Sequence, residues 1–246
     1  MKAIKDLTNE EKEFISLHYN KDMKAKELAE KLNMSVRSIY TFSKNNNLVK
    51  PLNPVFGITE YQEQIIYGGI LGDGSFKRNG SNYYYRECHA IPEAGYLNWK
   101  HQHLMPISRN KIYYIKKRKD TQNDQVEFCT VNTPSLKKYA EMSIDDVLDN
   151  INELGLAIWL LDDGWIRRNS KICSYGLSGG ALTCGQIDKA LKKFSSIGLD
   201  GHIVGSKKDI SFCSDNNKNM KKLMYTYFPQ DLDIIKKKIK DLKIKW

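Results

Sequence analysis

Three short stretches in the first fifty residues carry apolar side chains at the three-to-four-residue spacing of a helix with one buried face. They are 7–19, 24–34 and 36–46. Thr8 and Glu11 form a capping box for the first helix, and Ser35 can cap the third. Asn33 suits a tight turn between the second and third helices, because Asn tolerates positive φ. The pattern predicts a three-helix unit, with Val36, Ile39 and Tyr40 of the third helix facing inward.

Three short helices with this turn resemble a helix-turn-helix DNA-binding domain. The third helix of such a domain enters the major groove. It would offer Arg37, Ser38, Thr41 and Lys44 to DNA. A small three-helix unit that contacts other proteins is the alternative. The basic outer face of the third helix favours DNA.

A second pattern is a run of eight uncharged residues that ends in Asp-Gly, and it occurs twice. The first run, 65–72, leads into Asp73 and Gly74, and the second, 154–161, is followed by Asp162, Asp163 and Gly164. The two Asp-Gly pairs lie ninety residues apart. Thr59 and Gln62 form a capping box for the first of these helices. A lone Asp-Gly usually marks a turn, but its recurrence after two matching runs favours a functional role.

The residues after each Asp-Gly also correspond. Each copy reads as two strands, a helix, two strands and a further helix. The sequence therefore predicts an α+β fold, with a helix-turn-helix followed by a pseudo-two-fold pair of αββαββα halves. Pro51, Pro54 and Gly57 mark a connector between them. The predicted boundaries are 1–50 for the helix-turn-helix, 51–58 for the linker, 59–148 for the first half and 149–246 for the second.

Two uncharged helices placed side by side would bury one another, and parallel packing would bring both aspartates to one point. Gly68, Gly69 and Gly72, with Ala157 nearby, would allow a close approach of the backbones. A carboxylate is disfavoured at a helix C-terminus, because the helix dipole is negative there. We therefore interpret the aspartate pair as an active site rather than as two caps.

Composition narrows the class of partner. The chain has 246 residues and a net charge of +10, which favours a polyanionic partner. No uncharged stretch approaches the ~20 residues of a membrane helix, and the N-terminus lacks the apolar stretch of a signal peptide. We expect an intracellular protein, cytoplasmic or organellar if eukaryotic, that is not secreted and does not bind a membrane. Its five cysteines, without a CxxC pair, indicate neither a disulfide framework nor a zinc site.

Both motifs resemble those of the LAGLIDADG homing endonucleases, in the single-chain form that carries two motifs. The copies read "IYGGILGDG" at 66–74 and "LAIWLLDDG" at 156–164, and the resemblance covers about 59–246. Ile158 stands where the family has Gly, and Leu71 and Leu161 stand at the sixth motif position, where the family has Asp. The eighth position, which is the catalytic one, is Asp in both copies.

The resemblance implies a metal-dependent nuclease that cuts both DNA strands across the minor groove and leaves 3′ overhangs. Asp73 and Asp163 would bind two or three Mg²⁺ ions, with Mn²⁺ as a substitute, aided by the carbonyls of Gly72 and Asp162. Two carboxylates without a Ser/His or Cys/His constellation suit such ions. The side chain of Asp162 is expected to face elsewhere. The implied partner is a long asymmetric target in double-stranded DNA, bound by a monomer, in the setting of intron homing.

The family also places a basic residue near the metals of each half. Lys137 or Lys138 could serve one half, and Lys236 or Lys237 the other, although contact with phosphate is an equal alternative for the latter pair. The strands would read bases through their outward side chains. The DNA-contact candidates are Lys77, Arg78, Asn82, Tyr84, Arg86, Lys116 and Arg118 in the first half, and Arg167, Arg168, Lys171, Lys207 and Lys208 in the second.

Two other functions fit the same fold. An intron RNA maturase would bind RNA, and a non-catalytic DNA-binding regulator would use the first domain. The presence of both Asp73 and Asp163 argues against a role in binding alone.

Overall fold

Two separate hydrophobic cores form along the chain, one in each of two compact units, Met1–Val55 and Phe56–Trp246. The structure is a computed structural model. It describes residues 1–19, 23–46, 48, 55–109, 111–116, 124–168, 173–206, 208–239 and 242.

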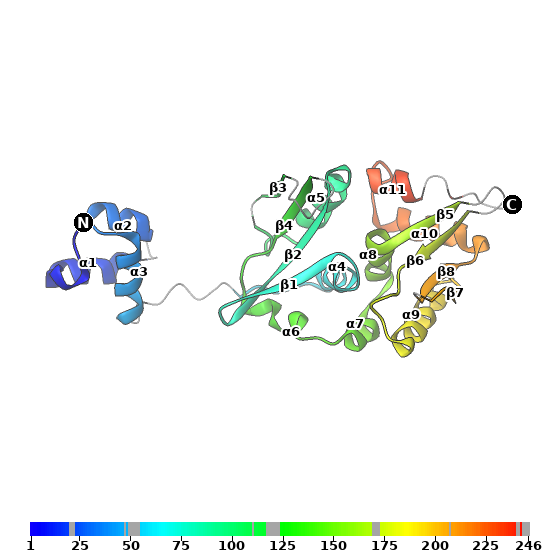
Figure 1. Cartoon of the computed structure of the whole chain (residues 1–246), viewed down its shortest axis with the longest axis horizontal. Coiled ribbons are helices and arrows are strands. Elements are labelled where there is room, and N and C mark those ends of the chain that lie inside the picture. Colours follow the sequence, from blue (N-terminus) through cyan, green and yellow to red (C-terminus); the bar gives the residue numbers. More distant parts are fainter. Residues whose placement is uncertain are drawn as a thin grey trace. The chain divides into compact units, whose positions relative to one another are not determined.

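The first unit contains the three helices that the sequence predicts (Figure 1). Its elements are η1 (Ile4–Asp6), α1 (Asn9–His18), α2 (Ala25–Lys31) and α3 (Val36–Asn45). The Thr8–Glu11 capping box begins α1, and the hydroxyl of Ser35 accepts a 3.0 Å hydrogen bond from the backbone N–H of Ser38. Asn33 turns the chain between α2 and α3 with a φ of 50°.

The inward face of α3 differs from the predicted one. Val36 and Tyr40 are 37% and 51% exposed, whereas Ile39, Phe42 and Ser43 are buried. Ile39 belongs to two overlapping stripes at helical spacing, and the helix buries the one that continues to Phe42. The outer face consequently carries Tyr40 beside the predicted DNA-contact residues.

The first half of the second unit begins with α4 (Glu60–Leu71), at the predicted capping box of Thr59 and Gln62. The elements that follow are β1 (Gly74–Asn79), β2 (Asn82–Ala90), η2 (Ile91–Glu93), α5 (Ala94–His103), β3 (Tyr113–Ile115), β4 (Gln125–Cys129), η3 (Pro134–Leu136), α6 (Lys137–Ala140) and α7 (Ile144–Asn150).

The second half repeats this plan. Its elements are α8 (Glu153–Asp163), β5 (Gly164–Arg168), β6 (Cys173–Leu177), α9 (Cys184–Ser196), β7 (Gly201–Val204), β8 (Asp209–Phe212), η4 (Ser214–Asn216), α10 (Asn217–Tyr227) and α11 (Asp233–Lys238). Both sheets are antiparallel, with the strand orders β1-β2-β4-β3 and β5-β6-β8-β7. This matching order confirms the α+β class and the pair of equivalent halves.

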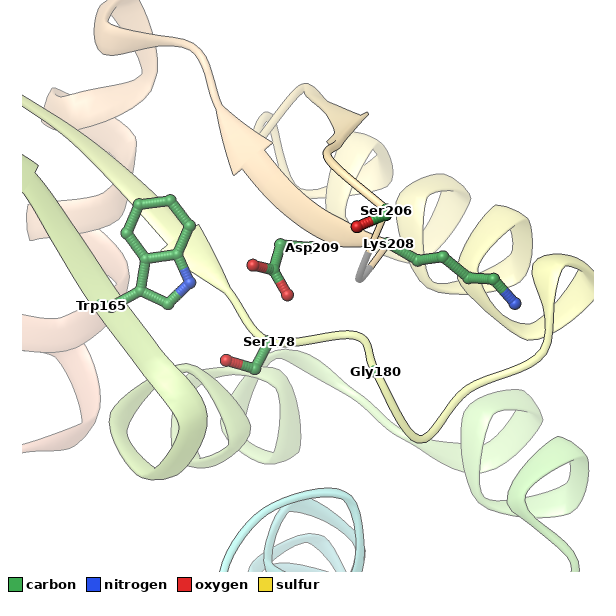
Figure 2. A pocket seen from close by; sticks show the side chains of 6 residues that line it. All are labelled: Trp165, Ser178, Gly180, Ser206, Lys208 and Asp209. Atoms are coloured by element: carbon green, nitrogen blue, oxygen red, sulfur yellow. The ribbon is translucent and has the colours of Figure 1, made fainter.

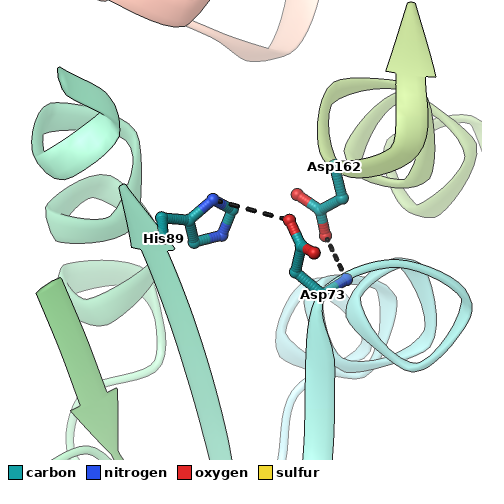
Figure 3. A group of neighbouring side chains, drawn as sticks. All are labelled: Asp73, His89 and Asp162. Carbon is teal, nitrogen blue, oxygen red and sulfur yellow. Dashed lines mark hydrogen bonds and ion pairs between the residues drawn. The ribbon is translucent and has the colours of Figure 1, made fainter. Parts of the chain in front are cut away.

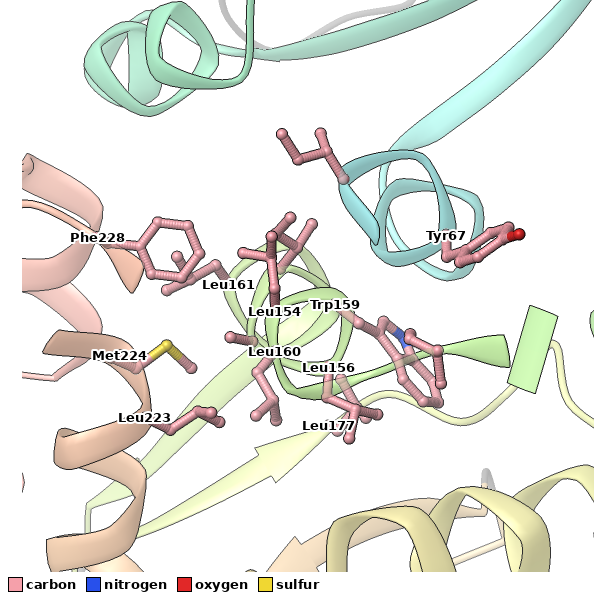
Figure 4. Close-up of a cluster of buried hydrophobic side chains, with 14 of the residues drawn as sticks. Tyr67, Leu154, Leu156, Trp159, Leu160, Leu161, Leu177, Leu223, Met224 and Phe228 are labelled. Atoms are coloured by element: carbon pink, nitrogen blue, oxygen red, sulfur yellow. The ribbon is translucent and has the colours of Figure 1, made fainter. Parts of the chain in front are cut away.

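The seam between the halves is the contact of α4 with α8, which lie side by side at the centre of this unit (Figure 1). α8 is buried on all sides, and its apolar side chains point toward α4, α10 and its own sheet (Figure 4). At Gly68 the backbones approach so closely that an added Cβ would lie 2.5 Å from the carbonyl oxygen of Gly155 and 2.6 Å from Cβ of Ile158.

The other two predicted glycines, Gly69 and Gly72, have different kinds of neighbour. Gly69 faces the hydroxyl of Tyr85 in its own half, and Gly72 faces the side chain of Asp162. Gly68 and Gly72 therefore both permit the close approach of α4 and α8, as predicted, whereas Gly69 makes room for a side chain of its own half.

The sequence patterns did not predict α7 and α11 as separate helices, and each packs on the opposite half. α7 contacts α9 and α4, while α11 contacts η2, α5 and α8. Lys189 of α9 pairs with Asp145 and Asp149 of α7 at 3.3 and 3.0 Å. Lys237 of α11 pairs with Glu93 at 3.2 Å. Through these contacts, α7 and α11 join the two halves on both sides of the seam.

Among the described residues, no helix combines the length and the apolar character that crossing a membrane would require.

Candidate active site

The two motif aspartates lie at the C-terminal ends of α4 and α8, where Asp73 follows the C-cap residue of α4 and Asp163 is the last residue of α8. The carboxylate of Asp73 is 41% exposed, and Asp163 is half-buried. Burial and the negative charge of Asp73 raise the pKa of Asp163 to about 6. The two carboxylates are thus close enough to repel one another, because a neighbouring negative charge disfavours ionisation.

Asp162 precedes Asp163, and its side chain is directed away from that residue into the first half. Its Oδ2 accepts a 3.4 Å hydrogen bond from the backbone N–H of Asp73 (Figure 3). Lys100 of α5 donates to both of its carboxylate oxygens at 2.8 and 2.9 Å, and the hydroxyl of Tyr96 donates at 2.9 Å. Successive residues of a helix point about 100° apart, so Asp162 and Asp163 face different neighbours.

A buried set of charged groups continues from Asp162 into the first half. Lys100 also donates to Glu87, and Glu87 accepts from His89 at 2.8 Å. His89 in turn lies 3.2 Å from Glu93 and 3.6 Å from Asp73. Although burial opposes charge on Glu87, Lys100 and His89 lower its pKa to about 2.

The ring of His89 carries a charge for a related reason. Burial opposes that charge, but the hydrogen bonds to Glu87 and Glu93 raise the pKa of His89 to about 10. Each negative group in this set therefore has a positive neighbour, as buried charges require.

Asp73, His89 and Asp162 have ligand atoms that all lie within 4.8 Å of one another, so they form one group that could hold a metal ion. Asp162 is already bound by an ammonium group, and both ring nitrogens of His89 have acidic partners. Asp73 and Asp163 instead combine accessibility with mutual repulsion. A divalent cation shared by these two carboxylates would remove the repulsion, and carboxylate oxygens are the ligands that Mg²⁺ prefers.

The lysines predicted near the metals lie elsewhere. Lys138 pairs at 2.8 Å with Glu63 in the first turn of α4, roughly 15 Å along the helix axis from Asp73. Lys137 is exposed at the start of α6. α6 therefore lies near the N-terminal end of α4, whereas Asp73 and Asp163, the acidic pair, lie at the C-terminal ends of α4 and α8.

The basic side chain that reaches the acidic pair in the second half is one residue beyond the predicted candidates. Lys236 pairs with Asp233 at 3.7 Å, and Lys237 points to Glu93. Lys238 instead donates to the carbonyl oxygens of Leu161 and Asp162, the latter at 3.2 Å, and burial lowers its pKa. The carbonyl of Asp162 predicted to bind metal therefore already accepts from Lys238, while the role of the Gly72 carbonyl stays a prediction.

The outward face of the first sheet collects most of the predicted DNA contacts. Lys77 is paired with Tyr84 in the β1–β2 register, and Asn82 and Arg86 share the face of Tyr84 by alternation. Arg78 falls on the opposite face, and its side chain donates to the carbonyl of Gly80 at 3.1 Å. Lys116 is exposed beyond the end of β3, and Arg118 lies outside the described residues.

Two further basic residues of this face were not predicted. The guanidinium of Arg109 lies 5.5 Å from the ring centre of Tyr84, and the ammonium of Lys111 lies 5.2 Å from that of Tyr113. Arg109 and Lys111 belong to the loop before β3, so strand alternation could not reveal them. Arg86, which was predicted, forms an ion pair with Glu127 at 2.5 Å.

On the second sheet, a hollow of about 420 Å³ opens beside the predicted Lys208. Trp165, Ser178 and Asp209 surround it, and the Lys208 side chain extends away from Trp165 (Figure 2). The backbones of Arg167 and Arg168 belong to β5, but their side chains lie outside the described part. Lys171 and Lys207 lie outside it as well.

Comparisons with known proteins agree with this architecture. The curated DNA endonuclease I-ChuI of Chlamydomonas applanata is 26% identical over 166 residues, which are 57% of this chain and 75% of the relative. The homing endonuclease I-WcaI, solved bound to its DNA recognition sequence, superposes with a TM-score of 0.62 at 16% identity, covering 96% of this chain and 99% of that one. That likeness shows the fold alone. Residues 63–238 match the model of the LAGLIDADG DNA endonuclease family, and the chain therefore belongs to this family.

Proposed function

We propose that this chain is a site-specific homing endonuclease that cuts both strands of DNA by metal-dependent hydrolysis of phosphodiester bonds and leaves 3′ overhangs. The observation that carries the proposal is the convergence of Asp73 and Asp163 at the ends of the two seam helices, where the charge of Asp73 helps to raise the pKa of Asp163. Membership of the family supports the reaction, and the net charge of +10 supports DNA as the partner.

In this proposal Asp73 and Asp163 hold two or three Mg²⁺ ions, which Mn²⁺ can replace. Such ions supply an activated water and offset the charge that develops on the phosphate. Lys238 contributes a positive charge beside the acidic pair, in the role first assigned to Lys236 and Lys237. In the first half Lys100 is the nearest equivalent, but it is fully buried and bound to two carboxylates.

The two sheets would read the two parts of a long asymmetric target. In the first sheet, Asn82, Tyr84 and Arg86 are the candidates for base contacts, because amide and guanidinium groups pair with base edges. Lys77 and Lys111 are better suited to phosphates. In the second sheet, Trp165 and Asp209 line a hollow that is open on the outward face.

The test is cleavage of a plasmid that carries the uninterrupted version of the chain's own insertion site. We expect linear product with Mg²⁺ or Mn²⁺, and binding without cleavage in Ca²⁺. Mapping the ends should give 3′ overhangs on the two sides of one site. An RNA maturase or a non-catalytic regulator would leave the plasmid intact in every metal, and that result would refute the proposal.

The first unit is expected to extend the DNA footprint through Arg37, Ser38, Thr41 and Lys44 of α3. Deleting residues 1–54 should leave a folded, Mg²⁺-dependent nuclease, because the second unit has its own core. Target affinity should fall by about 10-fold or more, since linked binding modules act together. Binding in Ca²⁺, followed by fluorescence anisotropy, measures the change.

The full-length double variant Arg37→Ala, Lys44→Ala serves as the matched control for this deletion. It removes two exposed cations of α3 and should reproduce most of the loss in affinity. Equal affinity of the deletion variant and the whole chain would contradict a DNA-binding role for the first unit.

The protein is expected to act as a monomer, because the seam between α4 and α8 already joins two halves within one chain. Sedimentation of the complex with its target in Ca²⁺ should give one chain for each DNA site. A stoichiometry of two chains per site would show that this seam does not supply both halves of the active unit.

A further inference from the structure

The buried set of charges beside the acidic pair is built from both halves. Glu87, His89 and Lys100 belong to β2 and α5 of the first half, and their exposed side-chain fractions are 0%, 1% and 0%. Asp162 of α8 completes the set from across the seam, with a side chain that is also 0% exposed. The ion pair of Lys100 with Asp162 is therefore fully buried, and it joins the two halves next to Asp73.

The second half has no such set at the corresponding positions. Glu87 and Leu177 occupy equivalent places, since each pairs with the glycine that follows the motif aspartate of its half. Lys100 and Ala190 are each the seventh residue of their helix, and both are fully buried. The fold thus accepts apolar residues where the first half has charges, and a buried ion pair is seldom better for stability than an apolar replacement.

The contacts of Asp162 indicate what the charges do. Its Oδ2 accepts the backbone N–H of Asp73, and its two oxygens are fixed by Lys100 and Tyr96. In the first motif, the position that corresponds to Asp162 is occupied by Gly72, which has no side chain. The backbone of Asp163 therefore has no equivalent carboxylate partner from the first motif. The ammonium of Lys100 also keeps Asp162 from acting as a third carboxylate ligand beside the proposed metal pair.

We infer that Asp162 is a positioning residue that holds Asp73 through its ion pair with Lys100, so that cleavage of one DNA strand depends on this pair more than cleavage of the other. This inference rests on the proposed function, because it concerns the same acidic pair. It goes beyond that function because it assigns a supporting ion pair to Asp73 and none to Asp163, so the two strands would be cut by unequal halves of the site.

The test uses target DNA labelled separately on each strand, with Mg²⁺, and compares the wild type with Asp162→Asn and with Lys100→Met. In both variants we expect the ratio of the two strand-cleavage rates to shift by at least ~10-fold, because a small misplacement of a catalytic group is costly. The same strand should be slowed in both variants, and nicked DNA should accumulate. A residue that only stabilised the fold would slow both strands together and leave the ratio unchanged.

Lys189→Met is the matched control, because it removes another ion pair between the halves, the one with Asp145 and Asp149, away from the acidic pair. Its strand ratio should equal that of the wild type. The double variant Lys100→Ala, Asp162→Gly introduces the residue types that the other half has at the equivalent positions, Ala190 and Gly72. It removes one positive and one negative charge together, so the strand ratio can be measured on it if a single variant does not fold.

The outcomes separate the two proposals. A wild-type chain that cuts neither strand refutes the proposed function. A wild type that cuts both strands, with unchanged ratios in the variants, refutes only the positioning role. The role is also refuted if Lys189→Met shows the same bias, or if the double variant cannot fold, since the charges would then serve the fold itself.

Discussion

Asp73→Asn and Asp163→Asn should each lower the rate of double-strand cleavage by at least ~100-fold, which corresponds to about 3 kcal/mol or more of transition-state stabilisation. Asn keeps the shape of the side chain but removes the negative charge that would attract a divalent ion. Each carboxylate also lies at the C-terminal end of a helix, where the helix dipole disfavours it. Replacement should therefore leave thermal stability unchanged or slightly higher.

Three measurements on the same proteins separate catalysis from folding. Cleavage in Mg²⁺ should be lost, binding in Ca²⁺ should stay near that of the wild type, and the melting temperature should not fall. Asp149→Asn, an exposed aspartate that pairs with Lys189, is the control and should retain cleavage. Near-normal cleavage by either of the first two variants would remove that aspartate from the active site, and unfolding would make it structural.

Gly68→Ala should destabilise the second unit by about 3 kcal/mol, because one added methyl group meets the backbone of the opposite helix. Its Cβ would lie 2.5 Å from the carbonyl oxygen of Gly155 and 2.6 Å from Cβ of Ile158. Neither atom is the mobile end of a flexible side chain, so relief requires α4 and α8 to separate. Cleavage should also decrease, since the same two helices bring the aspartates together.

Gly185→Ala is the matched control, because this glycine lies in the first turn of α9 with no atom within 4 Å of an added Cβ. Alanine should raise stability there by roughly 0.5–1 kcal/mol, through the lower entropy of the unfolded chain. Urea unfolding of both variants gives the comparison. Equal stabilities of the two would mean that the seam tolerates a side chain at Gly68.

Local signals in the sequence were sufficient for most of the fold. Capping boxes placed the starts of α1 and α4, and alternation placed the strands, because both depend on neighbours within a few residues. The repeat of Asp-Gly after an uncharged run then indicated two equivalent halves. α7 and α11 were missed as separate helices because they are short and owe their stability to packing on the opposite half.

The site was predictable in its motif and not in its surroundings. Lys100 follows Tyr96 and Leu97 at helical spacing, which places it on the buried face of α5, yet a lysine in a helix is ordinarily taken as exposed. Only the carboxylates of Glu87 and Asp162, brought from a strand and from the other half, explain its burial. Partners so distant in sequence leave no periodic signal.

The packing of α11 on the first half has a consequence for synthesis of the protein. Lys237 reaches Glu93 across 144 residues of chain, and the buried residues Ile234 and Ile235 belong to the same helix. On the ribosome, the first half emerges long before this helix, and domains generally fold as their sequence appears. The first half therefore keeps an open surface beside α5 until α11 has emerged and packed there.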